Sequence, residues 1–212
     1  MLRITAVLTA GALAAAVSVA SAAPVYDFKA ATSAAQTAAG AHRGPAQPYD
    51  IVASGVGELR QFLMNAQGRD PAEIREFLDR TIAPHFDFST MGRWAAGPFY
   101  RRLSEPQRAS YHLQLQHLFL SSLARNLGSF ATNVPPIQVL PPKTRRWGDE
   151  TIVRARVEPQ GGYPISVDFR FYRKGNEWQI FDVAANGFSA VTYYRRHFAS
   201  LVRMHGPQAL YR

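Results

Sequence analysis

Residues 165–173 read Ile-Ser-Val-Asp-Phe-Arg-Phe-Tyr-Arg, and this stretch decides the class of fold. Ile165, Val167, Phe169 and Phe171 alternate with more polar residues at a period of two, which is the period of a β-strand. A strand of this kind buries one face and exposes the other, as strands of antiparallel sheets commonly do. The sequence therefore predicts an antiparallel sheet with one apolar face.

Three neighbouring stretches extend this sheet. Residues 153–157 alternate in the same way, and a Gln-Gly-Gly turn at 160–162 would join them to the first strand as a hairpin. A Lys-Gly-Asn turn at 174–176 leads into another strand at 178–184, and residues 137–140 are expected to add one more. The expected sheet has about four antiparallel strands.

The chain before residue 136 has a helical period instead. Apolar residues recur every three or four positions over about 50–68, 70–84 and 105–127, and again over 189–204 after the strands. Capping-box patterns open the second and third of these helices. Helices first and strands afterwards predict an α+β domain in which helices cover one face of a curved sheet.

The N-terminal segment has the composition of an export signal. Arg3 precedes an uncharged apolar run, and Ala20-Ser21-Ala22 is a small-x-small cleavage pattern. An uncleaved anchor is the alternative, but the run is Ala-rich and short of the roughly 20 apolar residues that a spanning helix needs. We expect a signal peptide at 1–22, a flexible linker at 23–48 and one folded domain at 49–212.

Charge and cysteine content narrow the classes of function. The chain has a formal net charge of +9 and no cysteine, so disulfides cannot stabilise it and an apolar core must do so. A basic cytoplasmic protein would suggest nucleic acid as a partner. Export instead favours anionic membrane surfaces, anionic lipids or acidic proteins.

Two aspartates are the strongest candidates for chemistry. Asp87 lies between two phenylalanines and Asp182 between Phe181 and Val183, so burial could raise their pKa values toward those of a general base. An exported pocket enzyme of the isomerase type is therefore an alternative function. The structural alternative, which we favour, is that Asp87 caps the turn after it and Asp182 pairs with an arginine of a neighbouring strand.

No other catalytic or metal-binding pattern is present in the sequence. The six histidines lack the spacing of metal ligands, and no serine lies in a glycine-flanked elbow. We therefore predict no enzymatic activity, no catalytic residue, no metal ligand and no cofactor.

Residues 178–189 resemble the signature of the MlaC (toluene-tolerance) family. They read Trp-Gln-Ile-Phe-Asp-Val-Ala-Ala-Asn-Gly-Phe-Ser, similar to the family pattern Trp-x-Val-x-Asp-Val-x-x-Glu-Gly-Val-Ser. The segments at 86–88, 104–107 and 194–198 also fit that family, so the resemblance covers about residues 50–210. The chain departs from the pattern at Asn186, where the family has Glu, at Phe188, where it has a smaller aliphatic, and near Leu123, where it has Tyr.

The resemblance implies a fold and a function. The fold is an NTF2-like or cystatin-like curved sheet that, with its helices, encloses an apolar cavity for the acyl chains of a phospholipid. The function is a soluble periplasmic carrier that shuttles this cargo between an inner-membrane MCE-domain/ABC transporter complex and an outer-membrane lipoprotein complex, and so supports outer-membrane lipid asymmetry. We expect a monomer without a nucleic-acid partner, and a hopanoid or other lipid is the alternative cargo.

Ten apolar residues on the expected inward stripes are the predicted lipid-binding residues. They are Leu115, Phe119 and Leu123 on the long helix, Val153, Val167, Phe169 and Phe171 on the sheet, and Phe188, Val191 and Phe198 in the final segment. Burial of acyl chains is the physical reason for such a carrier, because each methylene is worth about 0.8 kcal/mol and a two-chain lipid would cost on the order of 20 kcal/mol to expose to water.

Four arginines are candidates for the mouth of the cavity or for a docking surface. They are Arg154, Arg156, Arg195 and Arg196. Solvated surface charge is the open alternative for each of them.

Overall fold

The structure is a computed structural model that describes residues 46–65, 70–128, 133–142 and 149–211. The predicted signal peptide and nearly all of the predicted linker lie outside the described residues. The helices are α2 (Pro48–Met64), α3 (Pro71–Phe77), α4 (Phe88–Ala96), α5 (Glu105–Gly128) and α6 (Ala190–His205). Short helical turns follow several of them: η2 (Leu78–Ile82), η3 (Ala83–His85), η4 (Gly97–Arg102) and η5 (Pro207–Leu210).

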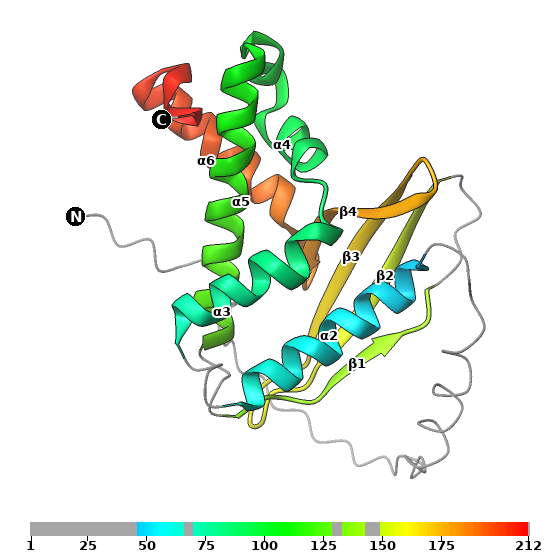
Figure 1. Cartoon of the computed structure of the whole chain (residues 1–212). Coiled ribbons are helices and arrows are strands. Elements are labelled where there is room, and N and C mark those ends of the chain that lie inside the picture. Colours follow the sequence, from blue (N-terminus) through cyan, green and yellow to red (C-terminus); the bar gives the residue numbers. More distant parts are fainter. Residues whose placement is uncertain (1–45, 66–69, 129–132, 143–148, 212) are drawn as a thin grey trace, which may run out of the picture. The chain divides into compact units, whose positions relative to one another are not determined.

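The strands form one antiparallel sheet in which each strand pairs with the next in the chain (Figure 1). They are β1 (Ile137–Leu140), β2 (Glu150–Val157), β3 (Ile165–Lys174), β4 (Glu177–Ala185) and β5 (Phe188–Ser189). The predicted fold class is confirmed, and β5 adds a short fifth strand to the four expected.

The register confirms the two-faced pattern of the strands. Phe169 lies between Val153 on β2 and Val183 on β4, so three apolar side chains form a row on one face. On the opposite face, Arg154 lies across from Asp168 and binds its carboxylate through Nε at 2.5 Å and Nη2 at 2.8 Å. The alternation in the sequence therefore corresponds to an apolar face and a polar face.

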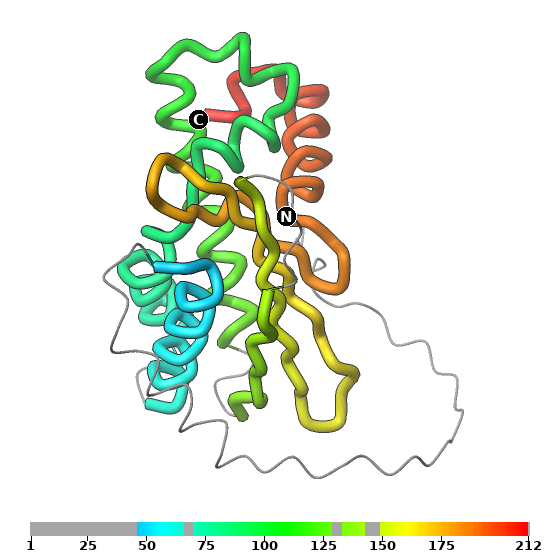
Figure 2. The backbone as a smooth tube through the Cα atoms, turned by 90° about the vertical axis from the view of Figure 1, so that its right-hand side faces the viewer, coloured from blue at the N-terminus to red at the C-terminus, as the bar shows by residue number. Residues whose placement is uncertain are grey.

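The helices contact the sheet in two groups. α2 contacts β1 and β2, whereas α4 and α6 pack against each other and contact β4 (Figures 1 and 2). The long helix α5 packs on α3 with one part of its length and on α4 with another. Buried residues of both groups and of the sheet form one continuous apolar core.

The region after α3 differs from the prediction. The single helix expected over 70–84 begins as predicted at Pro71, capped by Asp70, but changes to the π-turn η2 and then to η3, which contains Pro84. Helix α4 was not predicted, since its short sequence carries Gly92 and few large apolar residues. Its formation depends on packing against α5 and α6.

Candidate functional site

Partly exposed apolar side chains surround the buried core. They come from several helices and strands and pack against buried residues, but each keeps contact with solvent. On the helices they include Val56, Leu59, Phe62, Phe77, Leu118, Phe119, Leu123 and Val191; on the strands they include Val139, Phe169 and Val183. Apolar side chains held half-buried on several elements offer a surface that an apolar ligand could cover.

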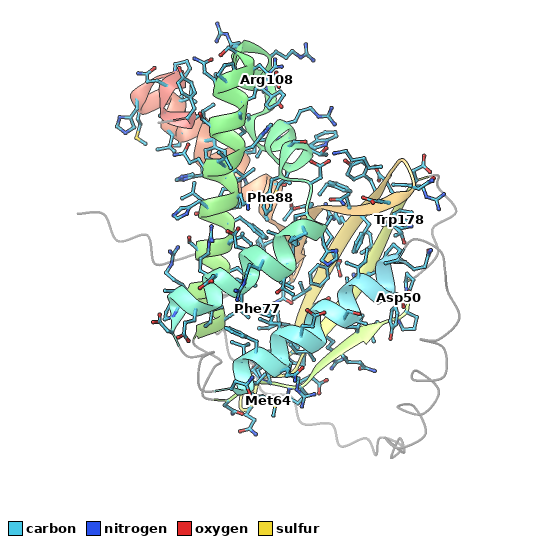
Figure 3. The ribbon with its side chains drawn as sticks, viewed as in Figure 1. Asp50, Met64, Phe77, Phe88, Arg108 and Trp178 are labelled. Atoms are coloured by element: carbon cyan, nitrogen blue, oxygen red, sulfur yellow. The ribbon has the colours of Figure 1, made fainter. Side chains whose placement is uncertain are left out.

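Aromatic rings link the elements that carry this surface. The rings of Phe62 on α2 and Phe77 on α3 stack with centroids 4.4 Å apart; Phe77 is labelled in Figure 3. The ring centroid of Phe119 on α5 lies 5.3 Å from that of Phe86 and 5.9 Å from that of Phe88. Apart from Phe119, these aromatic residues were not among the predicted lipid-binding residues, although the helical stripes of α2 and α3 contained the signal for Phe62 and Phe77.

The ten predicted lipid-binding residues fall into three groups. Leu115, Val153, Phe171 and Phe198 are fully buried and act as core residues in this structure. Phe119, Leu123, Val167, Phe169 and Val191 are partly exposed, so they retain surface for a ligand. Phe188 alone is exposed, at 78% of its surface.

The exposure of Phe188 corrects the expectation that this side chain lies inside. Register places Phe188 opposite Ala185, on the apolar face of the sheet but in the two-residue edge strand β5. A tight turn through Asn186 (φ 48°) and Gly187 (φ 85°) brings it there. Asparagine tolerates this left-handed conformation better than most residues other than glycine.

Phe198 also differs from its predicted setting. The centroid of its ring lies 5.2 Å from that of Tyr111 on α5 and 5.8 Å from that of Tyr194 on α6. This side chain therefore joins α6 to α5 through an aromatic contact.

Two hollows can be described on the protein. One, of about 430 Å³, is open to solvent and lies beside Asp87, with Phe86 and Phe88 on its apolar side and Lys174 and Gln116 on its polar side. The other, of about 410 Å³, runs along α2 beside Arg60 and Met64 and is also open. Neither hollow is lined by the ten predicted residues, so the enclosed cavity that the resemblance implied stays a prediction.

Asp87 is a buried junction between α4 and the sheet. Its carboxylate caps α4 by accepting from the Thr90 amide at 2.9 Å, and it also accepts from the hydroxyl groups of Ser89, Thr90 and Tyr172 and from Lys174 Nζ at 3.0 Å. Burial alone would raise its pKa, but these hydrogen bonds outweigh burial and hold the pKa of Asp87 well below its usual range.

Asp182 forms the corresponding junction at α6. Its carboxylate accepts from Arg170 Nη1 at 3.1 Å, from Ser189 Oγ at 2.7 Å and from the Val191 amide at 3.0 Å. Ser189 in turn caps α6 through the Thr192 amide. The structural alternative is therefore confirmed for both aspartates: Asp87 caps the segment after it, and Asp182 pairs with an arginine of the neighbouring strand.

Two further observations concern metal ions and membrane spans. In the part of the chain that the structure describes, no three His, Asp or Glu side chains are grouped so that they could hold a metal ion. Among the same residues, no helix is long and apolar enough to cross a membrane.

Fold and surface together define a small α+β domain in which a curved antiparallel sheet and its helices hold apolar side chains partly open to solvent. The family profile described as MlaC protein matches residues 54–212. The chain belongs to the MlaC family.

A solved structure shows the same fold. It is that of the phospholipid-binding protein from Ralstonia solanacearum in complex with a phospholipid. That protein is 20% identical to this chain, with a TM-score of 0.69 over 78% of this chain and 93% of the other.

Proposed function

We propose that this protein is a periplasmic lipid carrier that binds the acyl chains of a phospholipid between its sheet and helices. The observation that carries the proposal is the set of partly exposed apolar side chains on the helices and strands, in a member of the MlaC family. The phospholipid bound to the Ralstonia protein, which shares this fold, supports the same class of ligand.

Phe119, Leu123, Val167, Phe169 and Val191 are the residues proposed to contact the acyl chains. They lie on α5, β3 and α6 and are neither fully buried nor fully exposed. Covering such surface with methylene groups is favourable by about 25 cal/mol for each Å² removed from water. The headgroup would stay outside, where water can solvate it.

The state of Asp87 supports a carrier over an exported pocket enzyme. Asp87 borders an open hollow, which is where a general base would be needed. Its lowered pKa makes the carboxylate a weak base, and its oxygens are already occupied by five hydrogen bonds. Asp182 is buried and holds the start of α6, so neither aspartate is arranged to take a proton from a substrate.

The partners are part of the proposal. We propose that the carrier exchanges lipid with an inner-membrane MCE-domain/ABC transporter complex and with an outer-membrane lipoprotein complex. Phospholipid is the proposed cargo, and a hopanoid is the alternative that the test below would reveal.

Lipid extraction and mass spectrometry of the protein purified from cells test this function. We expect about one phospholipid per chain in the wild type and loss of most of it in Phe169→Gln, because an amide on the apolar face opposes the burial of methylenes. Ile152→Gln, on the polar face of the neighbouring strand, is the matched control and should keep its lipid. A wild-type protein without lipid, and without uptake from labelled vesicles, would contradict the proposal.

A further inference from the structure

Charge is divided unequally between two parts of the described chain. Residues 88–128 and 190–211 contain eight arginines and one carboxylate, Glu105, a net charge of +7. The remaining described residues contain eight basic residues and thirteen carboxylates, a net charge of −5. Among the described residues, the positive charge is therefore concentrated on α4, η4, α5 and α6.

Six of these arginines lie on two helical segments that pack together. Arg93 lies on α4 and Arg101 and Arg102 on η4, while Arg195, Arg196 and Arg203 lie on α6. All six are exposed, and the two segments contain no carboxylate. We call these six residues, with Trp94, the basic end.

The basic end lies away from α2 and β1. α4 and α6 pack side by side, at the opposite end of the folded unit from α2 in both views (Figures 1 and 2). Arg108, at the start of α5, lies at the same end (Figure 3) and is paired with Glu105 at 3.3 Å. One end of the folded unit is therefore strongly positive.

The basic end includes one exposed tryptophan, Trp94. The Arg195 guanidinium donates to the Trp94 carbonyl from Nε at 2.9 Å and from Nη2 at 2.7 Å, and so satisfies a carbonyl in the last turn of α4. The Trp94 side chain is 52% exposed. The structure therefore holds a half-exposed indole on the residue whose backbone carbonyl binds the Arg195 guanidinium.

We propose that the basic end docks this protein onto the surface of an anionic phospholipid bilayer. Its positive charge is complementary to anionic headgroups, and a tryptophan flanked by arginines suits the boundary between headgroups and acyl chains. The proposal goes beyond the carrier function, because it places the folded unit directly on lipid, with the charged helices rather than the sheet facing the membrane.

The distribution of apolar side chains favours a bilayer over an acidic protein. Trp94, Leu113 and Met204 are exposed on three different helices, α4, α5 and α6. Protein interfaces require a contiguous, well-packed apolar centre, whereas single side chains can enter a fluid headgroup layer independently.

Vesicle co-sedimentation tests the docking. The purified protein is mixed with vesicles of phosphatidylcholine alone or of phosphatidylcholine with an equal share of phosphatidylglycerol. We expect sedimentation only with the anionic vesicles, and weaker binding as salt rises. No binding to anionic vesicles at low salt would overturn the proposal and would leave an acidic protein as the partner of the basic end.

Two charge-matched triple variants separate a local site from general charge. The variant Arg93→Gln, Arg196→Gln, Arg203→Gln removes three charges from the basic end and should bind anionic vesicles on the order of 100-fold more weakly, at about five-fold per arginine. The variant Arg60→Gln, Arg80→Gln, Arg156→Gln removes three charges elsewhere and should bind nearly as well as the wild type. Equal losses in the two variants would overturn the assignment to the basic end.

Quenching by brominated phosphatidylglycerol gives an independent readout of the indole. We expect quenching in the wild type and its loss in Trp94→Phe, with the thermal transition of the variant unchanged. Unchanged quenching in Trp94→Phe would remove Trp94 from the site. Docking is measured as protein in the vesicle pellet and cargo binding as lipid carried by protein in solution, so the failure of one proposal is distinct from the failure of the other.

Discussion

Asp182 binds three donors from three parts of the chain with one buried carboxylate. Arg170 on β3, Ser189 before α6 and the Val191 amide in α6 all donate to it. Because only 2% of the Asp182 side chain is exposed, water cannot take the place of a donor that is lost. The residue joins the sheet to the last helix through polar contacts that the apolar core cannot supply.

Asp182→Asn should lower the free energy of unfolding by about 2–3 kcal/mol, because it removes the charge that three donors are oriented to bind. Asp168→Asn is the matched control, since it also loses an ion pair with an arginine, Arg154, but at the surface, where the cost should be at most about 1 kcal/mol. Urea unfolding measures both values. Equal losses would show that burial of Asp182 does not matter.

Asp87 makes the stability of the fold depend on pH. The pKa of Asp87 in the folded protein is well below its usual range, whereas its pKa in the unfolded chain is about 3.9. As the pH falls, the unfolded chain therefore takes up this proton first. The stabilisation is complete above about pH 4 and is lost progressively as the pH falls toward the pKa of the folded state.

We expect Asp87→Asn to be less stable than the wild type at neutral pH, with a difference that shrinks at about pH 3. Urea unfolding of both proteins across this range measures the difference, and the variant itself corrects for the other carboxylates. A difference that stays constant with pH would show that the Asp87 charge does not contribute to stability.

At the scale of elements, one glycine allows two helices to approach closely. The Tyr111 hydroxyl on α5 donates to the Gly92 carbonyl on α4 at 3.1 Å, and Tyr111 is fully buried. A Cβ atom at Gly92 would lie 3.0 Å from the Tyr111 ring and 2.8 Å from His112 Cδ2. The contact between α4 and α5 therefore requires a residue without a side chain at this position.

Gly92→Ala should destabilise the protein by about 1–3 kcal/mol, although alanine favours helix formation, because the rings must move out of a packed contact. Gly57→Ala, in α2 with no atom near its added Cβ, should instead stabilise by about 0.5–1 kcal/mol. Thermal unfolding measures whether each variant is less or more stable than the wild type. Stabilisation by both changes would contradict the close approach of α4 and α5.

At the scale of the whole molecule, the apolar side chains left partly open should couple stability to cargo. A ligand that binds only the folded state stabilises it by about 2.7 kcal/mol at 100 times its dissociation constant. We expect a higher melting temperature for delipidated protein when a short-chain phospholipid is added below its critical micelle concentration. Phe169→Gln should show little of this shift, and an equal shift in this variant would place the lipid elsewhere.

Local patterns in the sequence determined the fold class and most of the secondary structure of this protein. The alternation over 165–173, the helical stripes and the Asp70 cap depend on neighbours a few residues apart. The sheet, the family and four of the five α-helices among the described residues could therefore be predicted from the sequence. Both aspartates could also be assigned their structural roles, since Asp87 directly precedes the segment that it caps and arginines alternate along the strand expected beside Asp182.

Only the tertiary structure decided how much of each apolar side chain is covered. Val153 and Phe169 belong to the same alternating pattern, yet Val153 is fully buried and Phe169 is partly open, and Phe188 lies on an uncovered edge. Tyr172 and Lys174 bind Asp87 from 85 and 87 residues away. Periodicity reports the face on which a side chain lies, but exposure and partners depend on what the fold brings against that face.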